Sequence, residues 1–342
     1  MNRIRLVHVD TLSCEPILRR TPNGELLCIS QCGGTYEPAS ENRVYAFHSK
    51  DNGESWSEPE SIYPEDGNAV YATEVMVYDG VITAFLTIHH GHFLNWKCVM
   101  MKSYDSGYTW ENAGAPPHLP TYAFIRGKIQ LENGHILIPY HSYPVTQEMN
   151  DRVLKERGFD GACWHTNAEY VENGVLISTD KGKTFDRYPA NRMDMSEGWI
   201  WSEPTIVELG DGTIAMLMRK CRSGWLWRCD SRDGGRTWSE VYNTHILNPS
   251  NKPKLIKIPD GRIALIHTPN NEGMGNGKWG KRFPLSIWIS NDDMKTWGYR
   301  EVVTDFPGSY SYSDGFYENG HILFTVEYNR HDILFIDHEI RE

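Results

Sequence analysis

A short motif recurs five times along this chain with the general form S-x-D-x-G-x-T-W, where x is any residue; the first copy has Ser55 at the Thr position and the third has Phe185 at the Trp position. In each copy the Asp side chain can accept hydrogen bonds from backbone amides of the turn, the Gly can adopt a positive φ angle, and the aromatic ring can anchor the turn. The fifth copy carries Met294 at the Gly position. The Asp residues of the copies are Asp51, Asp105, Asp180, Asp233 and Asp292. One turn repeated in one order predicts a fold built from repeated units.

A second repeat counts those units. Six segments have an apolar run, a two-residue turn ending in Gly and another apolar run, which is a strong hairpin signal. Their glycines are Gly24, Gly80, Gly134, Gly212, Gly261 and Gly320. Six units of about four strands each predict an all-β, six-bladed β-propeller that occupies residues 1–342 as a single domain. Residues 4–9 alternate like a strand, and we expect them to complete the last blade and close the ring.

The third unit is longer than the others and contains an insertion at about residues 141–174. Residues 147–157 within it have the only helical pattern that we identify. The insertion is expected either to cover one side of a central pocket or to form an ordinary surface excursion.

Composition limits the partners and the compartment. The formal net charge of −11 argues against nucleic acid or an anionic membrane as the main partner, because both need clustered Lys and Arg. The start of the chain lacks the apolar core of a signal peptide, so we expect a cytoplasmic protein, or a secreted one if a leader has been removed. The seven cysteines have no metal-ligand spacing such as C-x2-C and are expected to be reduced.

The ligand site of a propeller forms where its inner strands converge, so residues that flank the six hairpins are informative. The position seven residues after each Gly holds Gln31, Thr87, His141, Arg219, Thr268 and Glu327. An inner strand rarely carries a charge without a purpose. His141, Arg219 and Glu327 are therefore predicted to point into one central pocket.

With both repeats, the chain resembles the sialidase (neuraminidase) superfamily of Asp-box or BNR-repeat proteins over nearly its full length. The resemblance implies that the repeated turns are structural. It also implies a glycoside hydrolase in which arginines bind the acidic group of a sugar, a Tyr assisted by a Glu is the nucleophile, and another acid protonates the leaving group.

Individual motifs carry these roles onto this chain. Ser202-Glu203-Pro204, followed by Met218-Arg219, resembles the family stretch with the assisting Glu and the second Arg. Arg282 precedes the fifth motif copy much as the third Arg does, and Tyr312-Ser313-Asp314 resembles the segment around the nucleophile. Glu327 matches a later Glu of the family. The resemblance therefore implies a retaining mechanism with Tyr312 as nucleophile and Glu203 as its base.

The chain departs from the family where the first Arg belongs. The matching place reads Cys14-Glu15-Pro16, and a thiol cannot replace a guanidinium on a carboxylate. We therefore expect a terminal acidic or polar sugar as the substrate, with true sialidase activity in doubt, and Arg126 as a possible source of the missing cation. The leaving-group acid is assigned to Glu41, with Glu37 as the alternative.

The chain also contains one cluster of histidines near residue 90. His89-His90-Gly91-His92 lacks nearby ligands at metal spacing, so we expect no metal and no cofactor, and His90 is predicted to line the pocket.

Two rival functions remain. One rival is a lyase in which Tyr312 or His141 removes a proton beside a uronate carboxylate. The other rival is a carbohydrate-binding propeller without catalysis. The expected partner in every case is an oligosaccharide or glycoside, and the sequence indicates no oligomeric state.

Overall fold

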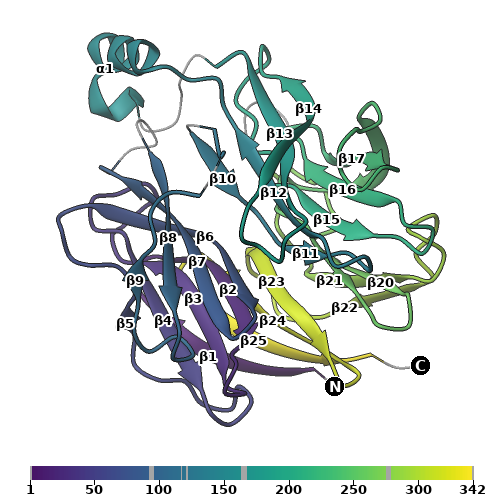
Figure 1. Ribbon diagram of the computed structural model, residues 1–342. Helices are drawn as coiled ribbons and strands as arrows, with labels where there is room; N and C mark the ends of the chain where they lie inside the picture. The colour runs from purple at the N-terminus through teal and green to yellow at the C-terminus, as the bar shows by residue number, and fades with distance from the viewer. Residues whose placement is uncertain are drawn as a thin grey trace.

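The computed structural model describes residues 2–91, 96–116, 118–120, 122–162, 168–274 and 279–340. Its strands form six antiparallel sheets, arranged as the blades of a β-propeller (Figure 1). The predicted all-β, six-bladed architecture is therefore confirmed. Within the described part of the chain, no helix combines the length and the apolar character needed to span a bilayer.

The first three blades follow one another along the chain. Blade one contains β2 (Ser13–Arg20), β3 (Leu26–Cys32), β4 (Arg43–Ser49) and β5 (Glu60–Ser61). Blade two contains β6 (Ala69–Tyr78), β7 (Val81–His89), β8 (Lys97–Ser103) and β9 (Glu111–Asn112). Blade three contains β10 (Ala123–Ile125), β11 (Ile129–Gln130), β12 (Ile136–Ser142), β13 (Tyr170–Ser178) and β14 (Asp186–Asp194), with β10 and β11 both paired to β12.

The remaining blades repeat the pattern, and the last one also takes in the first strand of the chain. Blade four contains β15 (Thr205–Glu208), β16 (Ile214–Arg219), β17 (Trp225–Ser231) and β18 (Tyr242–Leu247). Blade five contains β19 (Lys254–Lys257), β20 (Ile263–His267), β21 (Ser286–Ser290) and β22 (Tyr299–Val302). Blade six contains β23 (Tyr310–Glu318), β24 (His321–Tyr328), β25 (Asp332–Glu339) and β1 (Arg3–Val9).

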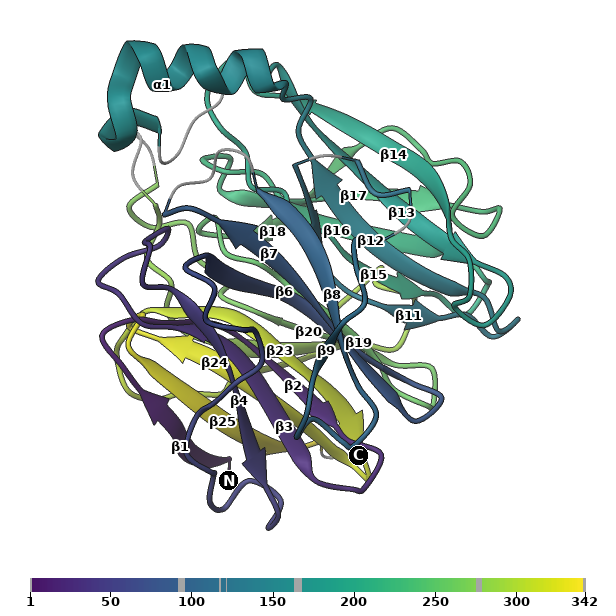
Figure 2. The same cartoon turned by 60° about the vertical axis from the view of Figure 1, so that its left-hand side comes forward.

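The N-terminal strand closes the ring as predicted. β1 pairs antiparallel with β25, from Arg3 opposite Asp337 to Val9 opposite Asp332, and the two strands lie together in Figures 1 and 2. Blade six also packs against blade one through a buried apolar cluster that includes Phe47 and Phe335. Closure hides an edge strand that would otherwise expose its backbone hydrogen-bonding groups.

The five repeated turns have one geometry. In the fourth copy, Ser231 Oγ donates to Asp233 Oδ1 at 2.8 Å, the Gly235 amide donates to Ser231 Oγ at 2.9 Å, and the Thr237 amide and hydroxyl donate to the two oxygens of Asp233. These hydrogen bonds lower the pKa of Asp233 to about 2 against the opposing effect of burial. In the fifth copy Met294 adopts φ 63° at the Gly position, so the turn forms there without a glycine.

The insertion in blade three contains the one helix of the described residues, α1 (Gln147–Ala162), between β12 and β13. It covers and extends the predicted helical patch. In both views α1 lies apart from the blades at one end of the molecule (Figures 1 and 2). Asn150 anchors it by donating a hydrogen bond to the Tyr122 hydroxyl at 2.9 Å.

Candidate active site

In or next to the innermost strand of each blade lies one buried polar or aromatic side chain. The position nine residues before the hairpin Gly holds a buried polar or aromatic residue in four blades, and in blades three and six the corresponding residue comes one position later. These residues are Glu15, Tyr71, Arg126, Glu203, Lys252 and Tyr312. Five of them line one cavity of about 590 Å³, and Lys252 is buried outside its lining.

Three of these side chains sit on strained backbone. Glu15, Glu203 and Tyr312 have positive φ angles of 50°, 41° and 53°, which cost non-glycine residues about 1–3 kcal/mol each. The pairing of β2 shifts around Glu15 and that of β23 shifts around Tyr312, which indicates β-bulges. Bulges redirect side chains, so they turn Glu15 and Tyr312 out of the regular alternation and toward the cavity.

Arg219 links the predicted base to the predicted nucleophile. Its Nε atom lies 2.9 Å from Glu203 Oε2 and donates to the Trp201 carbonyl, and its Nη2 atom lies 3.4 Å from the Tyr312 hydroxyl as a hydrogen-bond donor. The Arg219 side chain is buried, and its Nη1 atom also donates a hydrogen bond to the Ser250 carbonyl at 2.6 Å. The guanidinium therefore has a fixed orientation against both groups.

Arg126 holds the acidic side of the same cavity. Its Nη1 atom lies 2.5 Å from Glu15 Oε2, and its Nη2 atom donates to Glu203 Oε1 and to the Tyr71 hydroxyl, both at 3.2 Å. Burial raises the pKa of Glu15, and the charge of Arg126 opposes that rise. The predicted extra cation is therefore in the cavity, but it is already neutralised by carboxylates.

Arg282 differs from the other arginines of the cavity. It donates to the Ser311 hydroxyl at 2.6 Å and to the Ser250 carbonyl at 3.1 Å, and among the described residues it contacts no carboxylate. Its charged group lies 5.7 Å from the centre of the Tyr312 ring, the same distance as that of Arg219. Two guanidinium groups thus lie against the phenol ring.

The fourth arginine, Arg330, is paired with Glu37. Arg330 Nη2 lies 2.6 Å from Glu37 Oε2, and both residues line the cavity. Burial raises the pKa of Glu37, and Arg330 opposes that rise. A carboxyl group with a raised pKa can carry a proton that it donates to a substrate.

The environment of Tyr312 favours its neutral form. Burial raises its pKa most, the charge of Glu203 adds to the rise, and Arg219 opposes it. The phenol therefore keeps its proton at rest and needs a base to act as a nucleophile.

The structure brings together Arg126, Glu203, Arg219, Arg282 and Tyr312 as lining residues of one cavity. The other predicted site residues, Glu41, His90, His141 and Glu327, lie outside this lining.

Glu41 is exposed, accepts a hydrogen bond from Ser40 and lies outside the cavity lining. Glu37, the alternative for the leaving-group acid, lines the cavity instead. His90 is exposed beyond the end of β7 and is also outside the lining, so its predicted pocket position is wrong. His92 lies outside the described residues.

His141 and Glu327 are fully buried but do not line the cavity. His141 stacks on Phe124 with ring centres 5.1 Å apart, and burial lowers its pKa well below the usual value. Glu327 lies behind the cavity, where Arg330 and Arg282 partly compensate the effect of burial, which raises its pKa. Counting seven residues forward from each hairpin Gly thus identifies buried positions. Of the three candidates His141, Arg219 and Glu327, Arg219 is the one that lines the cavity.

The aromatic lining was not predicted from the sequence. Tyr71, Phe124, Trp201 and Trp279 surround the charged groups. Tyr71 would have been found, with Glu15 and Glu203, by counting nine residues back from each hairpin Gly instead of seven forward. Trp201 precedes Glu203 by two positions, and Trp279 lies in a loop without a repeated signal.

Comparisons with known proteins agree with this architecture. A sequence profile of the family described as BNR repeat-like domain matches residues 24–323. The comparison with curated proteins gave no match.

Solved structures share the fold at low sequence identity. A protein of unknown function from Dyadobacter fermentans is 17% identical, with a TM-score of 0.73 and 99% of both chains covered. The Hadza microbial sialidase Hz136 is 18% identical, with a TM-score of 0.73, and the match covers 96% of this chain and 66% of that one. The intramolecular trans-sialidase from Ruminococcus gnavus, solved with oseltamivir carboxylate, is 15% identical, with a TM-score of 0.65 and 96% of both chains covered. These likenesses confirm the predicted propeller.

Proposed function

Since this chain belongs to the family of BNR repeat-like domains and has a sialidase-like fold, we propose that it is a retaining glycoside hydrolase with Tyr312 as the nucleophile. The observation that carries the proposal is the position of Arg219, which contacts both Glu203 and Tyr312 at the wall of one central cavity. The phenol and the carboxylate thus share one buried guanidinium, and the charge of Glu203 acts on the Tyr312 phenol, which supports their pairing as nucleophile and base.

In the proposed first step, the Tyr312 oxygen attacks the anomeric carbon while Glu203 takes the phenol proton. The bond from the anomeric carbon to the leaving oxygen breaks, and Glu37 gives its proton to that oxygen. In the second step Glu37 removes a proton from water, which attacks the anomeric carbon and breaks its bond to Tyr312. Glu203 then returns the proton to the phenol. Two inversions give net retention.

The charges of the cavity suggest the substrate class. Arg126, Arg219 and Arg330 are each held by a carboxyl group of the protein, so Arg282 is the arginine of the described lining without an acidic partner and is left for a substrate anion. Cys14 stands where the family carries its first Arg, and the next residue, Glu15, lines the cavity and would repel a substrate carboxylate there. We therefore infer a terminal sugar with one acidic or polar substituent directed at Arg282, and sialosides as poor substrates.

The aromatic lining supports a sugar ligand. Trp201, Trp279, Tyr71 and Phe124 offer flat apolar faces on which the C–H faces of a sugar ring can stack, and their rings border the charged groups. Trp279 is 52% exposed, so it can reach a ligand at the cavity mouth.

A panel of aryl glycosides of neutral, uronic and sialic sugars tests the proposal, with the released aryl group, the reducing sugar and any unsaturated product measured together. Release of aryl group and reducing sugar without an unsaturated product is expected. An unsaturated product would instead identify a lyase, and binding without turnover of any member would identify a carbohydrate-binding propeller. Tyr36→Phe changes an exposed tyrosine of the same cavity and is the control for Tyr312→Phe; it is expected to retain activity.

A further inference from the structure

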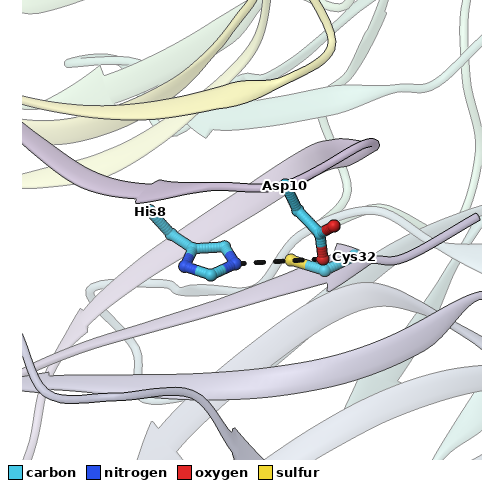
Figure 3. A group of neighbouring side chains, drawn as sticks. All are labelled: His8, Asp10 and Cys32. Carbon is cyan, nitrogen blue, oxygen red and sulfur yellow. Dashed lines mark ion pairs between the residues drawn. The ribbon is translucent and has the colours of Figure 1, made fainter.

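A second cluster of reactive side chains lies outside the central cavity, where blade six meets blade one. His8 lies in β1, Asp10 follows that strand, and Cys32 ends β3. Their ligand atoms all lie within 4.8 Å of one another, and His8 Nε2 is 3.9 Å from Asp10 Oδ2. Figure 3 shows the imidazole, the carboxylate and the sulfur directed toward one point.

We propose that His8, Asp10 and Cys32 form a zinc site that fastens the closing strand of the propeller to its first blade. An imidazole nitrogen, a thiolate and a carboxylate oxygen are the three ligand types of Zn²⁺ in proteins, and a water molecule would complete the tetrahedron. No spacing in the sequence indicates this site, because Cys32 is brought to the other two residues only when the ring closes.

The neighbours of Asp10 and His8 orient these two ligands, and the Cys32 sulfur contacts the Ser13 hydroxyl at 3.8 Å. Asp10 Oδ1 accepts hydrogen bonds from the amide and the hydroxyl of Thr11, at 2.6 and 3.1 Å, which orients Oδ2 toward His8. The His8 ring packs on Phe47, with ring centres 4.8 Å apart. Contacts of this kind around a metal ligand fix its orientation.

The geometry needs a small contraction to bind the ion. Bonds of about 2.0–2.3 Å to zinc place neighbouring ligand atoms about 3.5 Å apart, so the cluster must tighten by about 1 Å. His8 and Asp10 can make this movement because their side chains are 21% and 31% exposed. The same exposure gives the ion a path to the buried Cys32 sulfur.

Binding is a proton exchange at the sulfur. Burial raises the pKa of the Cys32 thiol to about 12, so the sulfur carries a proton in the absence of metal. On binding, the S–H bond breaks, the sulfur–zinc bond forms and the proton passes to solvent, with no change in oxidation state. His8 supplies a lone pair in its neutral form.

The consequence for the fold is a cross-link at its closure. His8 pairs with Ile333 of β25, whereas Cys32 pairs with Arg43 of β4, so the metal would join blade six to blade one directly. A ligand that binds only the folded chain stabilises that chain. A tenfold to hundredfold excess of free ion over Kd should raise Tm by about 2–4 °C for a chain of this size.

The test uses the full chain, stripped of metal and titrated with Zn²⁺ or Co²⁺. The expected result is one ion per chain, a sulfur-to-cobalt charge-transfer band in the near ultraviolet, and a higher Tm with Zn²⁺. Cys32→Ser should abolish the band and Asp10→Asn should weaken binding at least tenfold, while Cys98→Ser, a thiol in β8, should leave both unchanged. Asp10 is partly exposed, so its variant tests the site even if Cys32→Ser fails to fold. Absence of the band in the unaltered chain, or its survival in Cys32→Ser, would overturn the proposal.

Discussion

Arg219 donates its Nη2 proton toward the Tyr312 hydroxyl at 3.4 Å while its Nε atom lies 2.9 Å from Glu203. One guanidinium thereby fixes two groups that are about a hundred residues apart in the chain. Glu203, Arg219 and Tyr312 each lie in a strand or just before one, in blades four and six. The distances between the three side chains therefore depend on the ring as a whole.

Glu203→Gln removes the proposed base and keeps the shape of the side chain. Turnover of the best glycoside should fall about 10²–10⁴-fold, because Tyr312 then keeps its proton during attack, while KM changes little. The control is Glu208→Gln in β15, whose carboxylate contacts the Glu132 amide outside the cavity. Equal losses in both variants, measured by steady-state kinetics, would contradict a role for Glu203 as base.

Arg282→Ala removes the cation that contacts no carboxylate among the described residues. We expect KM for an acidic substrate to rise about 10- to 100-fold, since a charge-assisted contact worth about 1.5–3 kcal/mol is lost. A neutral analogue should be affected much less. Arg300→Ala, which removes a guanidinium stacked on Trp288 in an outer strand region, is the control. A similar rise in KM for acidic and neutral substrates would rule out the anion-binding role.

Glu15→Gln tests the buried pair that Glu15, the residue after Cys14, forms with Arg126. Glu15 and Arg126 are 2% and 3% exposed, and loss of one charge leaves the other without full compensation. The free energy of unfolding should decrease by about 3 kcal/mol. Glu132→Gln, which breaks a surface pair with Lys257 in which Glu132 is largely exposed, should cost less than about 0.5 kcal/mol. Urea denaturation of both variants provides the measurement.

Glu327→Gln tests the buried carboxyl group behind the cavity. Its pKa in the folded chain is raised above the usual 4.5, mainly by burial, so the unfolded chain loses this proton at lower pH than the folded chain does. Stability from this group is complete below pH 4.5 and is lost as pH rises through the raised pKa. The unfolding free energy of Glu327→Gln relative to the unaltered chain should therefore increase as pH rises from 4.5. A difference that stays flat with pH would contradict the raised pKa.

The fold was predictable because its signals are local. The Gly of each hairpin turn and the Asp of each repeated turn act on neighbouring backbone atoms, so counting them gave the blades. The pairing of β1 with β25 followed from the need to cover an edge strand.

The candidate site was predictable only in part. Glu203, Arg219, Arg282 and Tyr312 were found from short motifs in family order, and all four line the cavity. The sequence favoured Glu41 over Glu37, whereas Glu37 is the one that lines the cavity, because the choice depends on the path of one loop. Asn42 sets that path by donating to the Gly33 carbonyl at 2.7 Å and accepting from the Ala39 amide at 2.8 Å.

Other features depend on contacts between blades, which spacing does not encode. The pairing of Arg126 with Glu15 joins blade three to blade one. The cluster of His8, Asp10 and Cys32 joins the closing strand to blade one. Both needed the closed ring before they could be recognised.

The most direct test of the account is the mass of the chain trapped during turnover. A reactive glycoside should be mixed with the protein, quenched in acid and digested, and the peptide that contains Tyr312 should be examined by mass spectrometry. The account predicts that this peptide gains the mass of one glycosyl group, and that Tyr312→Phe lacks the adduct and turns over at least about 10³-fold more slowly. An unmodified peptide together with near-normal turnover by Tyr312→Phe would contradict it.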